Sequence, residues 1–193
     1  MDTSELLPGD LILTRSVAPD YVSRRITEAQ LRGGLASRHA QWTHAAVYLG
    51  DGEHICEASF KEPGFRWGVN IRSIFEYCNN EFAIRARRPK GLDDRQRIRI
   101  AVGAMANIGK RYSFREILKF RQAAAKGSFW GPGTRQSINP NALVCSTLYQ
   151  DAYNFSYQGM TLRMGMLCTP AHLSASTDFE STDPSLGWLE IQD

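Results

Sequence analysis

The sequence lacks long hydrophobic runs, closely spaced cysteines and a metal-binding histidine motif. No apolar stretch approaches the roughly 20 residues that a membrane-spanning helix needs. The N-terminal segment MDTSELLPGDLIL is acidic and has neither the basic region nor the apolar core of a secretory signal. We therefore expect a protein that is cytoplasmic as synthesised, with delivery by a non-Sec route left open. The four cysteines, which we expect to be reduced and to bind no metal, are Cys56, Cys78, Cys145 and Cys168.

The overall composition is that of an ordinary globular protein. The chain has 193 residues, 42% of them hydrophobic and 22% charged, and shows no repeat, linker or low-complexity tract. We expect a single domain over residues 1–193, without a cofactor. Its oligomeric state cannot be read from the sequence.

Positive charge is concentrated in one segment. Residues 85–126 contain thirteen Lys or Arg against three Asp or Glu, a net of +10, although the whole chain carries only +3. Such a segment could meet the phosphate or carboxylate groups of a substrate or an anionic lipid surface. A solvated helix face, partly neutralised by the acidic C-terminal region, is the slightly favoured alternative. We expect no specific nucleic-acid partner.

The stretch WTHAAVYLGDGEHICEAS, from Trp42 to Ser59, predicts a β-hairpin. Asp-Gly favours a two-residue turn, in which both central positions need positive φ. With Asp51 and Gly52 as the turn, Ala46 lies opposite Glu57 and His44 becomes a diagonal neighbour of Glu57 on the same face. Diagonal Cβ atoms are roughly 7–8 Å apart, which a Glu side chain can span to an imidazole. A slip of one residue would put the two on opposite faces.

A histidine oriented by a carboxylate can activate a nucleophile. A half-buried strand whose histidine makes one structural hydrogen bond is the alternative. The nucleophile candidate is Cys145, because apolar residues at helical spacing predict a helix over residues 141–155, capped by Asn139 or Asn141. There the helix dipole and free amide groups favour a thiolate, although a lone buried cysteine is more often structural.

The remaining segments predict short strands and helices. The alternation in Glu81–Arg88 indicates a strand that leaves Arg85 and Arg87 on a solvated face. Asp93 or Asp94 should cap a helix to Ile108, with an apolar face made of Ile98, Ala101, Val102, Met105 and Ile108. Gly127–Pro140, which includes Trp130, is expected to be a loop, either a plain connection or a lid or substrate wall. Further expected elements are a strand to Leu13 after the turn Pro8-Gly9-Asp10, strands at 68–71, 161–167 and 188–191, a helix within an insertion at 15–41 that Gly33-Gly34 ends, and helices at 113–126 and 170–175.

Taken together, these motifs resemble the circularly permuted branch of the NlpC-type papain-like cysteine hydrolases, the YiiX-like group, which is related to lecithin–retinol acyltransferase-like proteins. The strand half is carried by GDLIL at Gly9, THAAVYLGDG at Thr43 and EAS at Glu57. The remainder is carried by GKRYSF at Gly109, VCSTLYQDAY at Val144 and CTPAHLSAS at Cys168. The strand half precedes the cysteine helix, as it does in the permuted group.

The resemblance implies an α+β, papain-like core. In it an antiparallel sheet or half-barrel packs against helices, and the cysteine lies at a helix N-terminus. It also implies a triad of Cys145 as nucleophile, His44 as general base and acid, and Glu57 as orienting carboxylate, with Tyr112 and Trp130 as substrate-binding residues. The expected reaction is cleavage of an amide, in a peptide stem or an N-acylated small molecule, through a thioester. Lipid acyl hydrolysis or transfer is the runner-up, and a catalytically idle adaptor for an anionic partner is a third reading.

Overall fold

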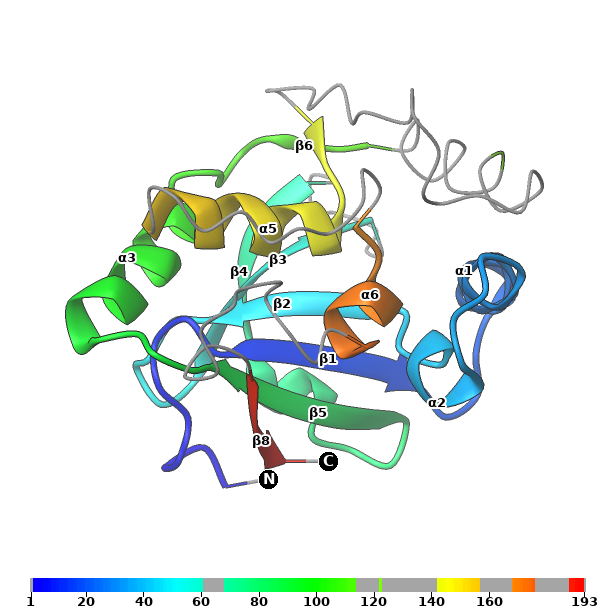
Figure 1. The fold of residues 1–193 in the computed structure, drawn as a ribbon, viewed down its shortest axis with the longest axis horizontal. Helices are drawn as coiled ribbons and strands as arrows, with labels where there is room; N and C mark the ends of the chain where they lie inside the picture. The colour runs from blue at the N-terminus through cyan, green and yellow to red at the C-terminus, as the bar shows by residue number, and fades with distance from the viewer. Residues whose placement is uncertain are drawn as a thin grey trace.

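The fold is α+β and is built on one mixed sheet (Figure 1). The computed structural model describes residues 2–60, 68–113, 122, 142–156, 168–175 and 188–192. Within these residues eight strands form the sheet, in the order β7-β6-β4-β3-β2-β1-β5-β8. The elements are β1 (Leu11–Ser16), α1 (Tyr21–Arg32), α2 (Ser37–Ala40), β2 (His44–Tyr48), β3 (His54–Ser59), β4 (Gly68–Ser73), the 3₁₀ helix η1 (Ile74–Tyr77), β5 (Phe82–Pro89), α3 (Asp94–Met105), β6 (Arg111–Tyr112), β7 (Ala142–Leu143), α5 (Cys145–Ser156), α6 (Pro170–Ala175) and β8 (Trp188–Gln192).

The sequence predicted an antiparallel sheet or half-barrel, but the observed sheet is mixed. Strand β7 runs parallel to β6, whereas the other pairings are antiparallel. The parallel pair arises because the chain leaves the sheet after Tyr112 and returns at Ala142 in the same direction. That return leads directly into α5 at Cys145.

The sheet has two apolar faces because its side chains alternate along each strand. Leu11, Leu13 and Val47 belong to the larger cluster, together with residues of α3, α5 and α6. Ile12 and Tyr48 belong to the smaller cluster, which includes Ile74 of η1. Glu57 pairs with Ala46 of the smaller cluster, so it lies on that same face.

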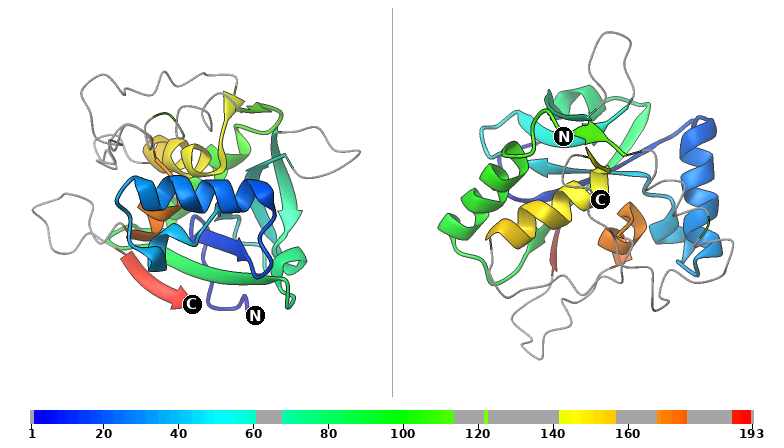
Figure 2. Two further views of the ribbon diagram at one scale, coloured as in Figure 1. Left: turned by 90° about the vertical axis from the view of Figure 1, so that its right-hand side faces the viewer. Right: turned by 90° about the horizontal axis from the view of Figure 1, so that it is seen from above.

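Helices α3 and α5 lie side by side over the first face (Figures 1 and 2). Asp93, one of the two predicted caps, caps α3, and it also forms a capping box with Gln96 that the sequence analysis did not predict. A Cβ added at Gly103 would lie 3.0 Å from the Phe155 side chain, so this glycine permits the close approach of α5.

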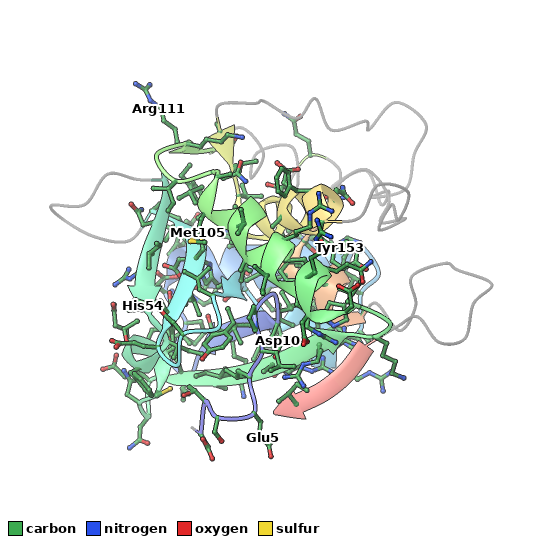
Figure 3. The ribbon with its side chains drawn as sticks, turned by 90° about the vertical axis from the view of Figure 1, so that its left-hand side faces the viewer. Glu5, Asp10, His54, Met105, Arg111 and Tyr153 are labelled. Carbon is green, nitrogen blue, oxygen red and sulfur yellow. The ribbon has the colours of Figure 1, made fainter. Side chains whose placement is uncertain are left out.

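The predicted apolar face of α3 was mostly wrong. Of its residues only Ala101 is buried, together with Ile100, Gly103 and Ala104, because α5 packs against the side that carries Gly103. The other expected residues form an exposed stripe, which includes Met105 in Figure 3: Ile98, Val102, Met105 and Ile108 are 52%, 43%, 37% and 48% exposed.

The predicted solvated face of β5 was also wrong. Arg87 is buried, and its guanidinium donates to the Leu173 and Ser174 carbonyl oxygens of α6 at 2.5 and 3.1 Å. Arg85 donates to the Ser174 hydroxyl at 2.6 Å. These carbonyls lie at the C-terminal end of α6, where positive charge is favourable. Two of the cations in the basic segment therefore hold a helix on the sheet.

A third arginine of that segment neutralises a buried carboxylate. Asp10, labelled in Figure 3 near the start of α3, is fully buried, and its two carboxylate oxygens accept from Arg88 at 2.9 and 2.7 Å. The Leu7 amide adds a third hydrogen bond at 2.9 Å. Burial nevertheless outweighs these partners and raises the pKa of Asp10 above its ordinary value.

Helix α1 lies at the opposite end of the sheet from α3 (Figures 1 and 2). Asp20 caps it by accepting from the Ser23 amide at 2.7 Å. The buried Gln30 side chain fixes its position. Gln30 donates to the Ala40 and Trp42 carbonyls and accepts from the Ala171 amide of α6. In the described part of the chain, no helix is long and apolar enough to cross a membrane.

Candidate functional site

The hairpin of β2 and β3 has the register that the sequence predicted. Ala46 pairs with Glu57 and Val47 with Cys56. The turn differs from the prediction, because positive φ occurs at Gly50 and Gly52 rather than at Asp51; among the described residues only glycines have positive φ. The Asp51 carboxylate instead accepts from the Glu53 and His54 amides, at 3.1 and 2.7 Å.

This register brings His44 and Glu57 into direct contact. The His44 Nε2 and Glu57 Oε2 atoms are 2.8 Å apart. The Glu57 side chain is fully buried, whereas that of His44 is 20% exposed. The carboxylate therefore fixes the imidazole from the protein interior and leaves the other ring nitrogen, Nδ1, for a second partner.

Two further residues, which the sequence analysis missed, hold Glu57. The Tyr77 hydroxyl donates to the same Oε2 atom at 2.7 Å, and the Tyr77 ring stacks on His44 with centroids 6.2 Å apart. Arg72 Nη1 lies 3.8 Å from Glu57 Oε1, an oxygen that accepts no hydrogen bond from the residues that the structure describes. Arg72 could have been found from the register, since it lies two residues beyond Asn70, the β4 partner of Glu57. No feature of the sequence around Tyr77 indicates that it contacts Glu57.

The site favours an imidazolium beside a carboxylate. Burial alone would lower the pKa of His44, but the negative charges of Glu57 and Cys145, and hydrogen bonds to both, raise it to about 10. Burial disfavours the Glu57 carboxylate, yet His44, Tyr77 and Arg72 hold its pKa below the ordinary value. Burial and the Glu57 charge raise the pKa of Tyr77, so its hydroxyl stays protonated and remains a donor.

Cys145 is the first residue of α5. The helix begins there rather than at the predicted Asn139 or Asn141, because β7 occupies Ala142–Leu143. Thr147 closes the first turn, with its hydroxyl accepting from the Val144 amide and donating to the Val144 carbonyl, both at 3.0 Å. Amide groups in a first helical turn have no intrahelical partner and favour negative charge.

The Cys145 sulfur faces the imidazole. Its charge and hydrogen bond are among the causes that raise the pKa of His44, and its charge also raises the pKa of Tyr112. Because Glu57 occupies Nε2, Nδ1 is the nitrogen available to the sulfur. The side chains named as a triad from the sequence are thus neighbours in the fold.

The other three thiols lie in different surroundings. Burial and the nearby Glu57 charge raise the pKa of Cys56 to about 12. Burial also raises the pKa of Cys168 and of Cys78. A raised pKa favours the protonated thiol, which is the less reactive form.

A cleft of about 220 Å³ opens beside His44. Tyr112, one of the two residues expected to bind substrate, lines it, and the Tyr112 ring packs on Phe60 with centroids 5.1 Å apart. The other predicted substrate-binding residue, Trp130, lies outside the described residues, as does the 127–140 segment around it. The remaining lining comes chiefly from β1, α1, the end of β3, the β4–η1 corner and the start of β5, and it includes Arg15, Val22, Ile26, Arg72, Tyr77 and Phe82.

Comparison with known proteins shows similarity in fold to a solved structure. No protein-family model matches the chain, and no curated protein matches it. It is similar to the crystal structure of metalloprotein YiiX from Escherichia coli O157:H7, DUF1105, with a TM-score of 0.52 and 16% identity, over 95% of this chain and 88% of that one. The chain therefore has a YiiX-like fold.

The description of that protein as a metalloprotein prompts a test of this chain for metal ligands. In the part of the chain that the structure describes, no three His, Cys, Asp or Glu side chains are placed to hold a metal ion. The negative side chains near His44 already serve other partners, since Glu57 Oε2 accepts from both His44 and Tyr77. The described residues thus do not supply a set of ligands for a metal ion.

Proposed function

We propose that this protein is a cysteine-dependent hydrolase of the permuted NlpC-type, papain-like kind, which cleaves an amide bond through a thioester. The observation that carries the proposal is the 2.8 Å contact between His44 and the buried Glu57, next to a cysteine that opens a helix. A buried carboxylate that orients a histidine beside a thiol is the arrangement that nucleophilic acyl transfer requires.

In the proposed reaction the Cys145 thiolate attacks the carbonyl carbon of the substrate, and the carbonyl electron pair moves to oxygen. The amide groups of the first turn of α5, which have no partner within the helix, are suited to stabilise this oxyanion. The imidazolium of His44 then gives its Nδ1 proton to the departing amine as the C–N bond breaks. Neutral His44 next takes a proton from water, which attacks the thioester and releases a carboxylic acid. This step restores the thiolate and the imidazolium.

Lipid acyl hydrolysis or transfer is the second candidate. The apolar side chains of Val22, Ile26 and Phe82 in the cleft would suit an acyl chain. The basic segment supports this candidate less than its charge suggested, because Arg85, Arg87 and Arg88 are engaged inside the protein. The exposed stripe on α3 also lies at the far end of the sheet from α1, which borders the cleft. A surface bound through α3 would leave the cleft facing away.

The test measures amine release from a panel of N-acyl and peptidyl amides, and fatty-acid release from anionic and neutral vesicles across a salt series. We expect amine release that Cys145→Ala abolishes and Cys78→Ser, a change in a thiol outside the site, preserves. Vesicle binding should be weak and salt-sensitive. Fatty-acid release with tight binding to anionic vesicles would favour the lipid enzyme. Binding without turnover of either substrate class, and indifferent to Cys145→Ala, would favour the adaptor.

A further inference from the structure

The cleft beside His44 is also lined by Arg15, a positively charged residue of the neighbouring strand β1. Arg15 follows Thr14, the residue of β1 that pairs directly with His44 of β2. Its guanidinium carbon lies 5.9 Å from the centroid of the Trp42 ring, so the side chain is held against an aromatic surface. Arg15 therefore enters the cleft from the strand next to the one that carries the histidine.

Within the described residues, Arg15 differs from Arg72, Arg85, Arg87 and Arg88 because its guanidinium has no hydrogen-bond or ion-pair partner. Among the described residues it makes neither a hydrogen bond nor an ion pair, and its Nε atom is buried without an acceptor. Arg72, the other cation of the cleft, contacts both Glu57 and Glu76. Arg85, Arg87 and Arg88 all bind groups within the protein.

An unsatisfied buried donor on a cation costs free energy, which an anion placed against it would recover. A guanidinium is also the side chain best suited to bind carboxylate or phosphate through paired hydrogen bonds. Glu76, which lines the same cleft, does not supply that anion, because its carboxylate is paired with Arg72. The apolar wall of Val22, Ile26 and Phe82 can hold the uncharged remainder of a ligand.

We propose that Arg15 binds an anionic group, carboxylate or phosphate, of the substrate whose acyl carbon is presented to Cys145 and His44. This inference rests on the proposed function and adds the substrate class, an acyl-amide with one negative charge beside an apolar portion. Arg15 is then a specificity residue, and a neutral amide of the same shape is a poorer substrate.

The experiment uses chloroacetyl probes, which alkylate the reactive cysteine as its sulfur displaces chloride and forms a thioether. The chloroacetyl derivatives of glycine, β-alanine and γ-aminobutyric acid place a carboxylate at increasing distances from the reacting carbon. Each is compared with its neutral amide, and chloroacetyl-aminoethyl phosphate supplies the phosphate arm. The rate of Cys145 labelling is followed by mass spectrometry in wild type, Arg15→Gln, Arg15→Lys and Arg24→Gln. Arg24, on the exposed surface of α1, is the matched control for loss of one charge.

We expect at least one anionic probe to label wild type about tenfold or more faster than its amide, as a charged hydrogen bond would predict. The preference should disappear in Arg15→Gln, persist in Arg24→Gln and survive in part in Arg15→Lys. Whether the carboxylate or the phosphate probe is preferred decides between the two sources of charge. Equal labelling by the anionic and neutral probes in wild type, or a preference that Arg15→Gln leaves unchanged, overturns the inference while leaving the proposed function intact.

Failure of all probes to label Cys145 would count against the proposed function instead. Arg15 is then tested by calorimetric titration with the unreactive N-acetyl counterparts of the same probes. Tighter binding of the anionic compound, lost in Arg15→Gln, would support the anion site, and equal binding of anion and amide would refute it. Because the wild-type comparison of anion with amide needs no variant, the test stands even where Arg15→Gln does not fold.

Discussion

Replacing Glu57 by Gln tests the part of the site that the hairpin register creates. The change preserves the shape of the side chain and an oxygen that can accept from His44 Nε2, but it removes the charge 2.8 Å from the imidazole. A hydrogen bond to a charged group is worth about 1.5–3 kcal/mol, or roughly 10- to 150-fold in rate where the charge matters only in the reacting state. We expect Glu57→Gln to lower kcat by a factor within that range. Cys145→Ala or His44→Ala should lower kcat further.

The pH dependence gives Glu57→Gln a distinctive signature. The pKa of His44 is raised from 6.5 to about 10, in part by the Glu57 charge. Turnover in wild type, which needs the imidazolium proton, should therefore decline only as the pH rises through about 10, and the decline should begin at lower pH in Glu57→Gln. The contribution of the His44–Glu57 pair to the free energy of unfolding changes with pH in the same direction. It is complete below pH 6.5 and is lost as the pH rises toward 10.

The assay is the pH profile of kcat/KM for the best amide substrate, together with thermal unfolding of both proteins. We expect a small change in stability, because removing a buried charge also removes its desolvation cost. An alkaline limb that does not move in Glu57→Gln, with unchanged turnover, would refute the role assigned to Glu57 and place the orienting group elsewhere.

Three further predictions concern the surroundings of the site. Tyr77→Phe keeps the ring that stacks on His44 but removes a hydrogen bond that lowers the pKa of Glu57. The acid limb of the kcat/KM profile should therefore move to higher pH. An acid limb that does not move would mean that Tyr77 only packs against His44. Arg88→Ala leaves the Asp10 carboxylate buried without its ion pair and should lower the free energy of unfolding by about 3–5 kcal/mol in urea titrations. Arg25→Ala, which removes an exposed ion pair with Glu28, should change it little. Equal effects of the two substitutions would contradict this prediction. Gly68→Ala places a Cβ 2.2 Å from the Lys110 carbonyl oxygen and should destabilise the protein by about 1–3 kcal/mol, with loss of hydrogen-exchange protection in β4; unchanged protection would show that β6 can move away freely.

The sequence predicted most where local chemistry decides the structure. The alternation and the Gly-Asp-Gly turn set the hairpin register, and the register alone brought Glu57 to His44. The turn conformation was wrong in detail, because the two flanking glycines adopt positive φ at no steric cost, while Asp51 uses its carboxylate to hold the turn.

Predictions that depended on distant segments were less successful. Arg85 and Arg87 alternate with apolar residues as on a solvated strand, yet α6, more than 80 residues later in the chain, covers them. The exposed stripe of α3 follows from the packing of Gly103 against α5, which helical periodicity alone cannot reveal. Tyr77 reaches Glu57 from a 3₁₀ helix 20 positions away, and only the folded structure shows it.

The most direct test of the central claim is the order in which the four cysteines react. Wild-type protein is treated with substoichiometric iodoacetamide at mildly acidic pH, and each cysteine peptide is quantified by mass spectrometry. Burial raises the pKa of Cys56, Cys78 and Cys168, whereas Cys145 lies at the start of α5 beside the His44 imidazole, the placement of a reactive cysteine. The account predicts that Cys145 is labelled first and that His44→Ala removes its advantage. Labelling led by another cysteine, with Cys145 inert in the folded protein, would contradict it.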